Sequence, residues 1–286
     1  MVFMLLLPHL ASCVLLPRVL FADCDGTMLG PDHRLSDRTR NTLQRLARAG
    51  VAVVPATGRA AAGPWTAHVL TEPSLKGGVP GIFMNGGMIV DSAGGVSSTL
   101  LPAEVAAATL AFARGEGVTT AFYCGKEVLV ETPNELTAKL AAVGDAPHRT
   151  IEDLSSAVES VGKVLLLFDE TKLDGETLRH SLERAVAATA DITQALSWGL
   201  EVVPSGVNKA TAARLLLDAW GISSEDAMAI GDGVNDVELL SFVGYGIAMG
   251  NGAKQAKLVA QYVAPSNSDE GFSIAMEELI LAHLES

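Results

Sequence analysis

The sequence predicts an α/β protein: a doubly wound parallel-sheet core with an inserted α+β domain. Three observations support this prediction. Short, wholly apolar runs end in clusters of small and polar residues, and helical patterns with recognisable ends follow several of them. A middle stretch mixes strand-like and helical segments, and no polar cluster stands at its strand ends. Alternation of buried strands and helices is typical of a parallel sheet covered on both faces.

The predicted core strands are four apolar runs, at residues 19–22, 51–54, 227–230 and 246–249. Each is short, rich in Val, Ile, Ala or Leu, and bounded by turn residues. Such runs fit strands that are buried on both faces of a sheet.

Two helices of the core have clear ends. One is predicted between Ser36, an N-cap residue, and Gly50, which stops the helix. The other is predicted over Lys209–Trp220, with Leu215, Leu216 and Ala219 facing the core and Gly221 as the stop.

The predicted domain plan has three parts. Residues 17–101 and 191–286 form the catalytic core, and residues 102–190 form the inserted domain. Residues 1–16 form a leader or extension of uncertain role.

The leader is apolar, and Leu10–Cys13 resembles a lipoprotein cleavage box. However, no Lys or Arg precedes the apolar run, and Pro8 and His9 interrupt it. The run is also too short to span a bilayer. We therefore favour an extra strand or a disordered leader over a targeting segment, and we predict no membrane partner.

The composition and net charge of the chain argue against some classes of partner and indicate a compartment. Of the 286 residues, 49% are apolar, which is enough for a large core, and the net charge is −13. A chain this acidic without a Lys/Arg run argues against a nucleic-acid partner. Its three cysteines, Cys13, Cys24 and Cys124, show neither zinc spacing nor a disulfide framework. We therefore expect a cytoplasmic protein that is a monomer or a small homo-oligomer.

Two carboxylates, Asp23 and Asp25, directly follow the first predicted strand, and Gly26 allows a sharp turn after them. Such a pair can divide the work of phosphoryl transfer. One carboxylate attacks phosphorus, and the other exchanges protons with the leaving oxygen and then with water. The alternative is a solvated turn, although the apolar strand before it places the pair at a sheet edge.

A second acidic cluster, residues 231–236 (GDGVND), follows the third predicted strand. Asp232 and Asp23 would together suit Mg²⁺, which prefers carboxylate, phosphate and water oxygens. The alternative is helix capping by Asn235 or Asp236, and both interpretations can hold at once.

Two further features suit an anion. Thr57 and Gly58, after the second strand, offer a hydroxyl and backbone N–H groups to phosphate, or form an ordinary turn. Arg59 then binds an anion or, as we favour, braces the loop. Lys209 opens a helix, where the dipole disfavours a cation. It therefore either neutralises Asp23 and phosphate or is a surface lysine.

Together these motifs resemble the haloacid dehalogenase superfamily, specifically its Cof-type phosphatase branch with an inserted α+β (type IIB) cap. The matching segments are DCDGT (23–27), ATGR (56–59), the Lys209 helix and GDGVND (231–236). Asn85-Gly86-Gly87 and residues 245–252 (YGIAMGNG) also resemble that branch. Ala210 departs from it, because the family usually has Gly after the Lys.

The resemblance implies a role for each matching residue. Catalysis would be carried by Asp23 as nucleophile, Asp25 as acid/base, and Thr57 and Lys209. The substrate would be bound by Thr57, Gly58, Arg59, Asn85, Lys209 and Asn235. The cofactor Mg²⁺ would be held by Asp23, Asp232 and the backbone carbonyl of Asp25, with support from Asn235 and Asp236.

The predicted function is therefore a Mg²⁺-dependent phosphatase that hydrolyses a small phosphorylated metabolite through an aspartyl-phosphate intermediate. A sugar phosphate is the default substrate. One alternative is a phosphomutase of the phosphomannomutase type, with Lys126, Arg149 and Lys163 as candidates for gripping a second phosphate. A second alternative is a non-catalytic module that binds a metal or a partner.

Overall fold

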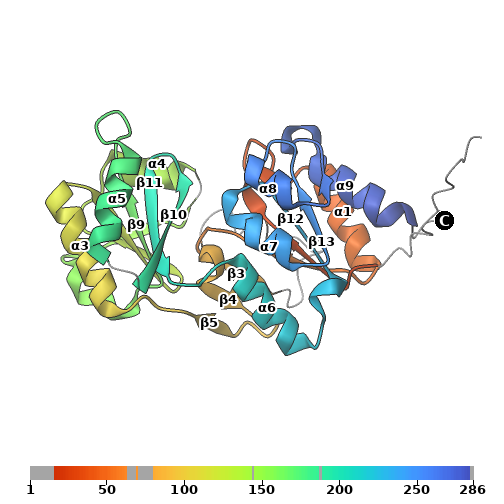
Figure 1. Ribbon diagram of the computed structural model, residues 1–286, viewed down its shortest axis with the longest axis horizontal. Coiled ribbons are helices and arrows are strands. Elements are labelled where there is room, and N and C mark those ends of the chain that lie inside the picture. The colour runs from red at the N-terminus through yellow and green to blue at the C-terminus, as the bar shows by residue number, and fades with distance from the viewer. Residues whose placement is uncertain (1–15, 63–68, 70–79, 144, 187–188, 284–286) are drawn as a thin grey trace, which may run out of the picture.

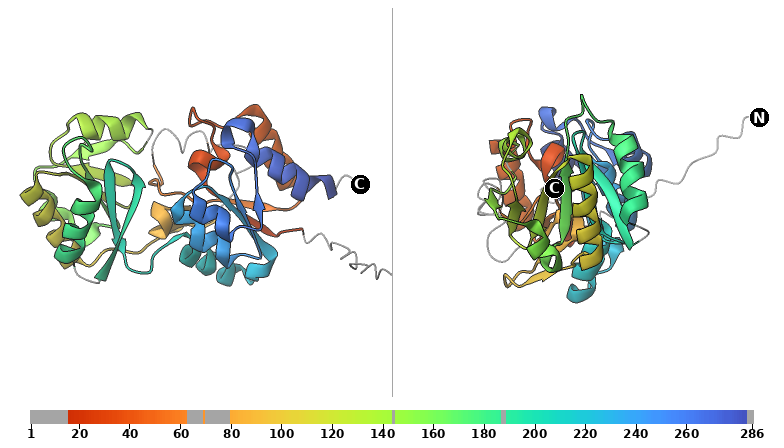
Figure 2. Two further views of the ribbon diagram at one scale, coloured as in Figure 1. Left: turned by 45° about the horizontal axis from the view of Figure 1, so that its top comes forward. Right: turned by 90° about the vertical axis from the view of Figure 1, so that its left-hand side faces the viewer.

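The computed structural model describes residues 16–62, 69, 80–143, 145–186 and 189–283. The predicted leader, apart from Leu16, lies outside the described residues. The chain forms two lobes joined by two connecting segments (Figure 1). The lobes remain distinct in the turned view of Figure 2. Within the described ranges, no helix combines the length and the apolar character that a membrane span requires.

The core contains a five-stranded sheet in the order β14-β13-β12-β1-β2. All neighbouring strands pair in parallel, and β1 lies between β12 and β2. This arrangement confirms the predicted parallel sheet. The strands are β1 (Val19–Ala22), β2 (Ala52–Pro55), β12 (Ala227–Gly231), β13 (Tyr245–Ala248) and β14 (Tyr262–Val263).

Helices cover both faces of this sheet, as the doubly wound prediction requires. Leu20 and Ala22 of β1 belong to the same apolar cluster as residues of α1 and α9. Val19 and Phe21 belong to a second cluster with residues of α6, α7 and α8. Alternate side chains of a strand point to opposite faces, so β1 is buried on both sides. The helices are α1 (Asp37–Arg48), α6 (Lys209–Trp220), α7 (Val237–Phe242), α8 (Lys254–Val259) and α9 (Gly271–Leu279).

Helix α6 has the predicted length, but only one of the three side chains predicted to face the core is buried. Leu215, predicted to face inward, is 61% exposed, and Ala219 is also exposed. Leu216 is buried as predicted, and Lys209, Ala212, Ala213 and Leu217 lie on the same buried face. These residues follow the i, i+3, i+4, i+7, i+8 spacing of one helix face. The inward side chain of Lys209 thus belongs to the face that packs on the sheet.

A small antiparallel sheet connects the core to the inserted domain. It consists of β3 (Gly81–Phe83), β4 (Met88–Val90) and β5 (Val96–Ser98), in that order. A bridge between Ala56 and Ile82 aligns β3 with the end of β2. The polypeptide therefore leaves the core sheet next to the carboxyl ends of its strands.

The inserted domain contains a six-stranded sheet in the order β10-β11-β9-β6-β7-β8. All of its pairings are antiparallel except the one between β7 and β8. Its elements are α3 (Ala103–Glu116), β6 (Thr119–Cys124), β7 (Glu127–Val130), α4 (Glu135–Ala142), β8 (His148–Thr150), β9 (Lys163–Leu167), α5 (Gly175–Val186), β10 (Ala190–Leu196) and β11 (Gly199–Pro204).

The predicted boundary of this domain at residues 190/191 is wrong. Strands β10 and β11 pair with each other, and β11 pairs with β9, so both belong to the inserted sheet. The chain therefore returns to the core after Pro204. The run at residues 199–204 is buried and apolar apart from Glu201, and on local pattern alone it resembles a core strand.

The inserted sheet has two different faces. Phe122, Val164 and Leu200 pack with residues of α3 and α5, which lie on the side away from the core in Figure 1. The next residues along these strands, Tyr123 and Glu201 among them, point the other way, because side chains alternate along a strand. That second face lies toward the core and carries several polar groups.

Candidate active site

Asp23 and Asp232 directly follow two neighbouring parallel strands, β1 and β12. The backbone N–H of Asp23 donates to the carbonyl of Ile230 at 2.9 Å, which keeps Asp23 in register at the sheet edge. Gly26 turns the chain with φ +74°, and a Cβ there would lie 2.3 Å from Asp232 Oδ2. Glycine at this position therefore lets the two acidic loops approach each other.

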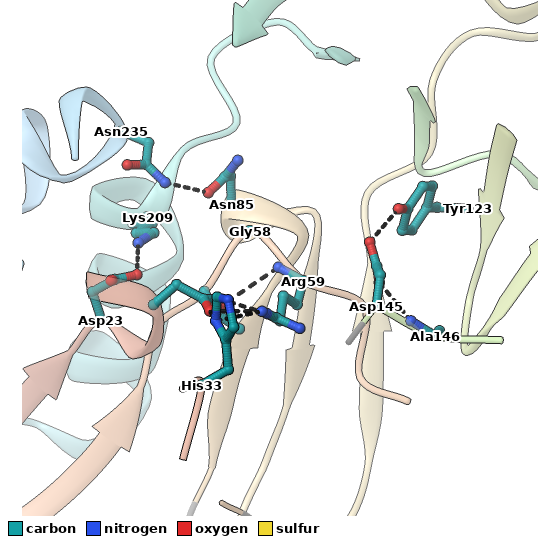
Figure 3. Close-up of polar contacts among 12 residues, drawn as sticks. Asp23, His33, Gly58, Arg59, Asn85, Tyr123, Asp145, Ala146, Lys209 and Asn235 are labelled. Atoms are coloured by element: carbon teal, nitrogen blue, oxygen red, sulfur yellow. Dashed lines mark hydrogen bonds and ion pairs between the residues drawn. The ribbon is translucent and has the colours of Figure 1, made fainter. Parts of the chain in front are cut away.

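Lys209 lies between two carboxylates. Its Nζ donates to Asp23 Oδ1 and to Asp236 Oδ1, both at 2.6 Å, and its side chain is fully buried. Figure 3 shows the ammonium directed at Asp23. Asn208 caps the helix and accepts a hydrogen bond from Thr211 N, so the start of α6 is fixed.

The cluster contains more negative charge than Lys209 neutralises. Burial raises the pKa of Asp23 well above its usual value, and Asp236 and Asp232 add to the effect against the opposing charge of Lys209. Burial and then Asp236 raise the pKa of Asp232 to about 6. Burial acts to lower the pKa of Lys209, but its contacts with Asp23 and Asp236 outweigh burial and raise it. These carboxylates would be stabilised by a further cation.

The same carboxylates fit a divalent metal ion. One oxygen each from Asp23, Asp232 and Asp236 lie within 4.8 Å of one another. Hard oxygen donors of this kind suit Mg²⁺. Asp236 Oδ2 also accepts from the backbone N–H groups of Asp232 and Gly233, so Asp236 organises the loop. The structure thus brings together three of the five residues predicted around the metal.

The remaining two, Asp25 and Asn235, direct their side chains elsewhere. Asp25 pairs with Arg59 through Nε–Oδ2 (2.5 Å) and Nη2–Oδ1 (2.6 Å), and His33 Nδ1 lies 2.9 Å from Oδ1. Burial acts to raise the pKa of Asp25, but the hydrogen bonds and charge of Arg59 outweigh burial and lower it. Arg59, which follows Thr57 and Gly58, therefore holds the loop that contains Asp25 close to the loop that contains Thr57.

Thr57 and Gly58 stand at the carboxyl end of β2. Thr57 is 1% exposed, its N–H donates to Ile82, and its Oγ1 accepts from Arg59 N at 3.2 Å. The carbonyl of Gly58 accepts from Lys163 of the inserted domain at 3.0 Å. This loop is therefore held by both lobes.

The side chains of Asn85 and Asn235 form part of a chain of hydrogen bonds between the lobes. Asn235 Nδ2 donates to Asn85 Oδ1 at 2.9 Å, as Figure 3 shows. Asn85 Nδ2 in turn donates to Glu201 Oε2 at 3.1 Å. The acidic loop of residues 231–236 is thus connected through Asn85 to the inserted domain.

A cavity of about 420 Å³ lies between the two lobes. Seven predicted site residues line it: Asp23, Asp25, Thr57, Gly58, Arg59, Asp232 and Asn235. Lys209, Asn85 and Asp236 lie buried behind this wall. The inserted domain contributes Tyr123, Leu140, Val143, Asp145, Lys163, Leu165, Gln194, Leu196 and Glu201.

The sequence indicated Lys163 only for the phosphomutase alternative, and it did not indicate Glu201, Asp145 or His33 as site residues. Glu201 interrupts an otherwise apolar strand, and Lys163 opens another, so an isolated charge in a buried strand was the available signal. Asp145 lies between helix α4 and strand β8, and no feature of the local sequence marks it as a site residue. His33, whose φ of 58° is in the left-handed region, lies in the loop after the first strand.

The family model for haloacid dehalogenase-like hydrolases matches residues 20–276. The chain therefore belongs to this family, as its motifs predicted. The curated relatives that match over nearly their full length are named phosphatases. The chain is therefore a phosphatase enzyme of this superfamily.

Among curated proteins, 5-amino-6-(5-phospho-D-ribitylamino)uracil phosphatase YitU of Bacillus subtilis is 28% identical over 92% of this chain and 97% of its own. HMP-PP phosphatase of Enterobacter sp. is 32% identical over 82% of this chain and 84% of its own. A chloroplastic protein of Arabidopsis thaliana named endoribonuclease YBEY is 29% identical over 90% of this chain, but the match spans only 45% of that protein.

Solved structures agree with the fold. A haloacid dehalogenase-like hydrolase from Bacteroides thetaiotaomicron has a TM-score of 0.82 and 28% identity, covering 92% of this chain and 99% of its own. The subclass IIB sugar phosphatase BT4131 has a TM-score of 0.81 and 25% identity, covering 91% and 98%. The predicted Cof-type branch with its inserted cap is thereby confirmed.

Proposed function

We propose that this chain is a Mg²⁺-dependent phosphatase that hydrolyses a small phosphorylated metabolite through an aspartyl phosphate on Asp23. One observation carries the proposal. The Asp23 carboxylate lies at the wall of the cavity between the lobes, 2.6 Å from the buried ammonium of Lys209 and within the acidic cluster. Family membership supports the same reaction class.

Asp23 and Asp232 are the proposed metal ligands, and the backbone carbonyl of Asp25 is the third proposed protein ligand. Bound Mg²⁺ would neutralise charge on the phosphate and on both carboxylates. Lys209 fixes the orientation of Asp23 and adds positive charge from behind it. Thr57 and Gly58 face the cavity. There the Thr57 hydroxyl and the backbone N–H groups of this loop would donate hydrogen bonds to phosphate oxygens.

In the first step, a carboxylate oxygen of Asp23 attacks phosphorus, and the bond from phosphorus to the leaving oxygen breaks. Asp25 leaves its ion pair with Arg59, is protonated, and gives this proton to that oxygen, so that an alcohol leaves. The products of this step are the alcohol, the aspartyl phosphate and the Asp25 carboxylate.

In the second step, water attacks the phosphorus of the aspartyl phosphate. The Asp25 carboxylate, the form that Arg59 stabilises, takes the proton from this water. The bond to Asp23 breaks, inorganic phosphate forms, and Asp25 is protonated again for the next cycle.

The substrate we propose is a small phosphate ester of a sugar or a related metabolite. The named relatives act on small phosphorylated molecules, and one solved relative is a sugar phosphatase. The cavity volume of about 420 Å³ suits a ligand of that size. We propose the reducing cytosol as its compartment, because the described cysteines, Cys24 and Cys124, are not in disulfides.

The phosphomutase alternative has weaker support. It requires free cations in the inserted domain to grip a second phosphate. However, Lys163 pairs with Glu201 at 2.8 Å, and Arg149 pairs with Glu127 at 3.1 Å. The third candidate, Lys126, is exposed and does not line the cavity. The full set of acidic and basic groups around Asp23 likewise favours an enzyme over a non-catalytic module.

A panel of phosphate monoesters, assayed with and without Mg²⁺, tests the proposal. We expect hydrolysis of several esters by the wild type and none by Asp23→Asn. Failure of the folded wild type to hydrolyse any ester with Mg²⁺, or equal rates for Asp23→Asn, would overturn it.

A further inference from the structure

The part of the cavity wall that the inserted domain forms contains a buried tyrosine–carboxylate pair. Tyr123 Oη donates to Asp145 Oδ2 at 2.5 Å, and the N–H of Ala146 donates to Oδ1 at 2.7 Å. Tyr123 is fully buried and Asp145 is 8% exposed, yet both residues line the cavity. In the view of Figure 3, Arg59 lies between Asp23 and this pair. The pair therefore stands away from the reacting centre.

The charge of this wall is negative. Its described charged residues are Asp145, Glu201 and Lys163. The Lys163 ammonium donates to Glu201 at 2.8 Å and to Gly58 O at 3.0 Å, and lies 4.1 Å from the centre of the Tyr123 ring. Lys163 thus balances Glu201. Arg59 of the core attracts Asp145 as well as its partner Asp25, so three carboxylates face two cations and the wall keeps a net negative charge. Burial, followed by the charge of Asp145, raises the pKa of Tyr123 well above its usual value.

The same wall is apolar beside the carboxylate. Leu140, Val143, Leu165 and Leu196 line the cavity there. A polar group that left water for this surface without a hydrogen-bond partner would be destabilised. An apolar ring or carbon face would be stabilised instead, because its burial removes apolar surface from water.

We propose that this wall is a leaving-group subsite in which Asp145 selects phosphate esters with a hydrogen-bond-donating, non-anionic leaving group that also has an apolar face. The proposal rests on the proposed phosphatase function and deepens it. A carboxylate accepts about four hydrogen bonds, and the two described contacts leave capacity for a hydroxyl, amine or ring N–H. A second phosphate or a carboxylate on the leaving group is repelled by Asp145.

Three matched aryl phosphates test this subsite: the 3-aminomethyl, 3-hydroxymethyl and 3-carboxy derivatives of phenyl phosphate. They differ mainly in the charge and donors at one ring position. For the wild type we expect kcat/KM to fall in the order aminomethyl, hydroxymethyl, carboxy, with about tenfold or more between the first and the last.

Asp145→Asn is the diagnostic variant. Its kcat/KM relative to wild type should fall for the aminomethyl ester and rise for the carboxy ester, each by about threefold or more. Taking this ratio for each substrate cancels differences in intrinsic reactivity. Asp174→Asn is the matched control, because Asp174 is exposed on the inserted domain away from the cavity and Asn also caps a helix. We expect the control to leave all three ratios equal.

Two results would overturn the subsite: a wild-type rate for the carboxy ester that equals the rate for the aminomethyl ester, or equal ratios for the three esters in folded Asp145→Asn. The wild-type comparison stands even if the variant fails to fold. Inhibition of the wild type by the three free phenols gives a second measurement, with 3-(aminomethyl)phenol expected to bind most tightly. Absence of hydrolysis for every ester would instead contradict the proposed function.

Discussion

Lys163 of β9 and Glu201 of β11 form a buried ion pair, with Nζ and Oε1 2.8 Å apart and side chains 2% and 6% exposed. The same ammonium donates to the Gly58 carbonyl of the core, and the same carboxylate accepts from Asn85. This pair therefore joins the inserted domain to two loops of the active site.

Breaking this pair should be costly. Lys163→Met or Glu201→Gln alone leaves a buried group without its partner, and we expect each to reduce the free energy of unfolding by about 3 kcal/mol. The double variant should lose less than the sum of the two, with a coupling of about 1–3 kcal/mol. Urea unfolding of the four proteins measures this cycle.

The exposed pair Arg149–Glu127 in the same domain is the matched control. Arg149→Met, Glu127→Gln and their combination should each leave the free energy of unfolding nearly unchanged, because both side chains are exposed to solvent. Additive effects at Lys163 and Glu201, as small as those in the control, would show that the buried pair does not stabilise the protein.

Mg²⁺ should stabilise the folded protein through the acidic cluster. A ligand that binds only the native state raises its stability, by about 2.7 kcal/mol at 100 times its Kd. We therefore expect Mg²⁺ to raise the Tm of the wild type and of Asp218→Asn, an exposed control on α6. The rise should be absent in Asp232→Asn. The same Tm rise in all three proteins would mean that Mg²⁺ binds elsewhere.

Asp25 should matter for both halves of the reaction. Asp25→Asn removes the proton donor and acceptor but keeps the size of the side chain, and we expect kcat to fall by about 10²–10⁴-fold. Asp32→Asn, a control in the exposed part of the same loop, should keep its activity. Steady-state kinetics on the best ester decides this, and a fall of less than about threefold for Asp25→Asn would remove its acid/base role.

The contact between α1 and α9 should depend on pH. Arg38 hydrogen-bonds Glu277 through Nη2–Oε2 at 2.6 Å, and this contact, against opposing burial, lowers the pKa of Glu277. A depressed carboxyl pKa stabilises the fold above the unfolded pKa of about 4.3. That stability is lost as pH falls through the folded pKa.

Arg38→Gln should therefore destabilise the protein by up to about 1 kcal/mol near neutral pH. As the pH falls below the unfolded pKa of about 4.3 and Glu277 becomes protonated, the difference should shrink, provided that both proteins remain folded. Urea titrations at several pH values test this. A difference that stays constant with pH would show that the ion pair adds nothing.

The sequence predicted the parts of the fold that local pattern determines. β1 and the bounds of α6 match their predicted ranges, because apolar runs and helix caps are local signals. The clustering of Asp23 and Asp232 could also be predicted, because the carboxyl ends of parallel strands meet at one sheet edge. The place of Lys209 beside Asp23 was predicted from its position as a cation at the start of a helix.

The sequence predictions that the structure contradicts depend on contacts between segments that are far apart in the sequence. The pairing of β11 with β9 joins residues more than 30 positions apart, and no local pattern distinguishes it from a core pairing. On α6, the predictions for Leu215 and Ala219 are wrong, because the face that packs on the sheet passes through Lys209, a residue that an apolar pattern does not include. Asp145 lies on a connecting segment, and only the folded inserted domain brings it to the cavity.

We propose that Asp23 carries the phosphoryl group during turnover, and mass spectrometry can detect that group on the enzyme. Asp25→Asn is mixed with Mg²⁺ and the best ester, quenched in acid and digested. We expect the peptide containing Asp23 to gain the mass of one phosphoryl group, and the Asp23→Asn protein to gain none. Hydrolysis by the wild type with no phosphorylated Asp23 peptide, or a phosphoryl group on another residue, would contradict it.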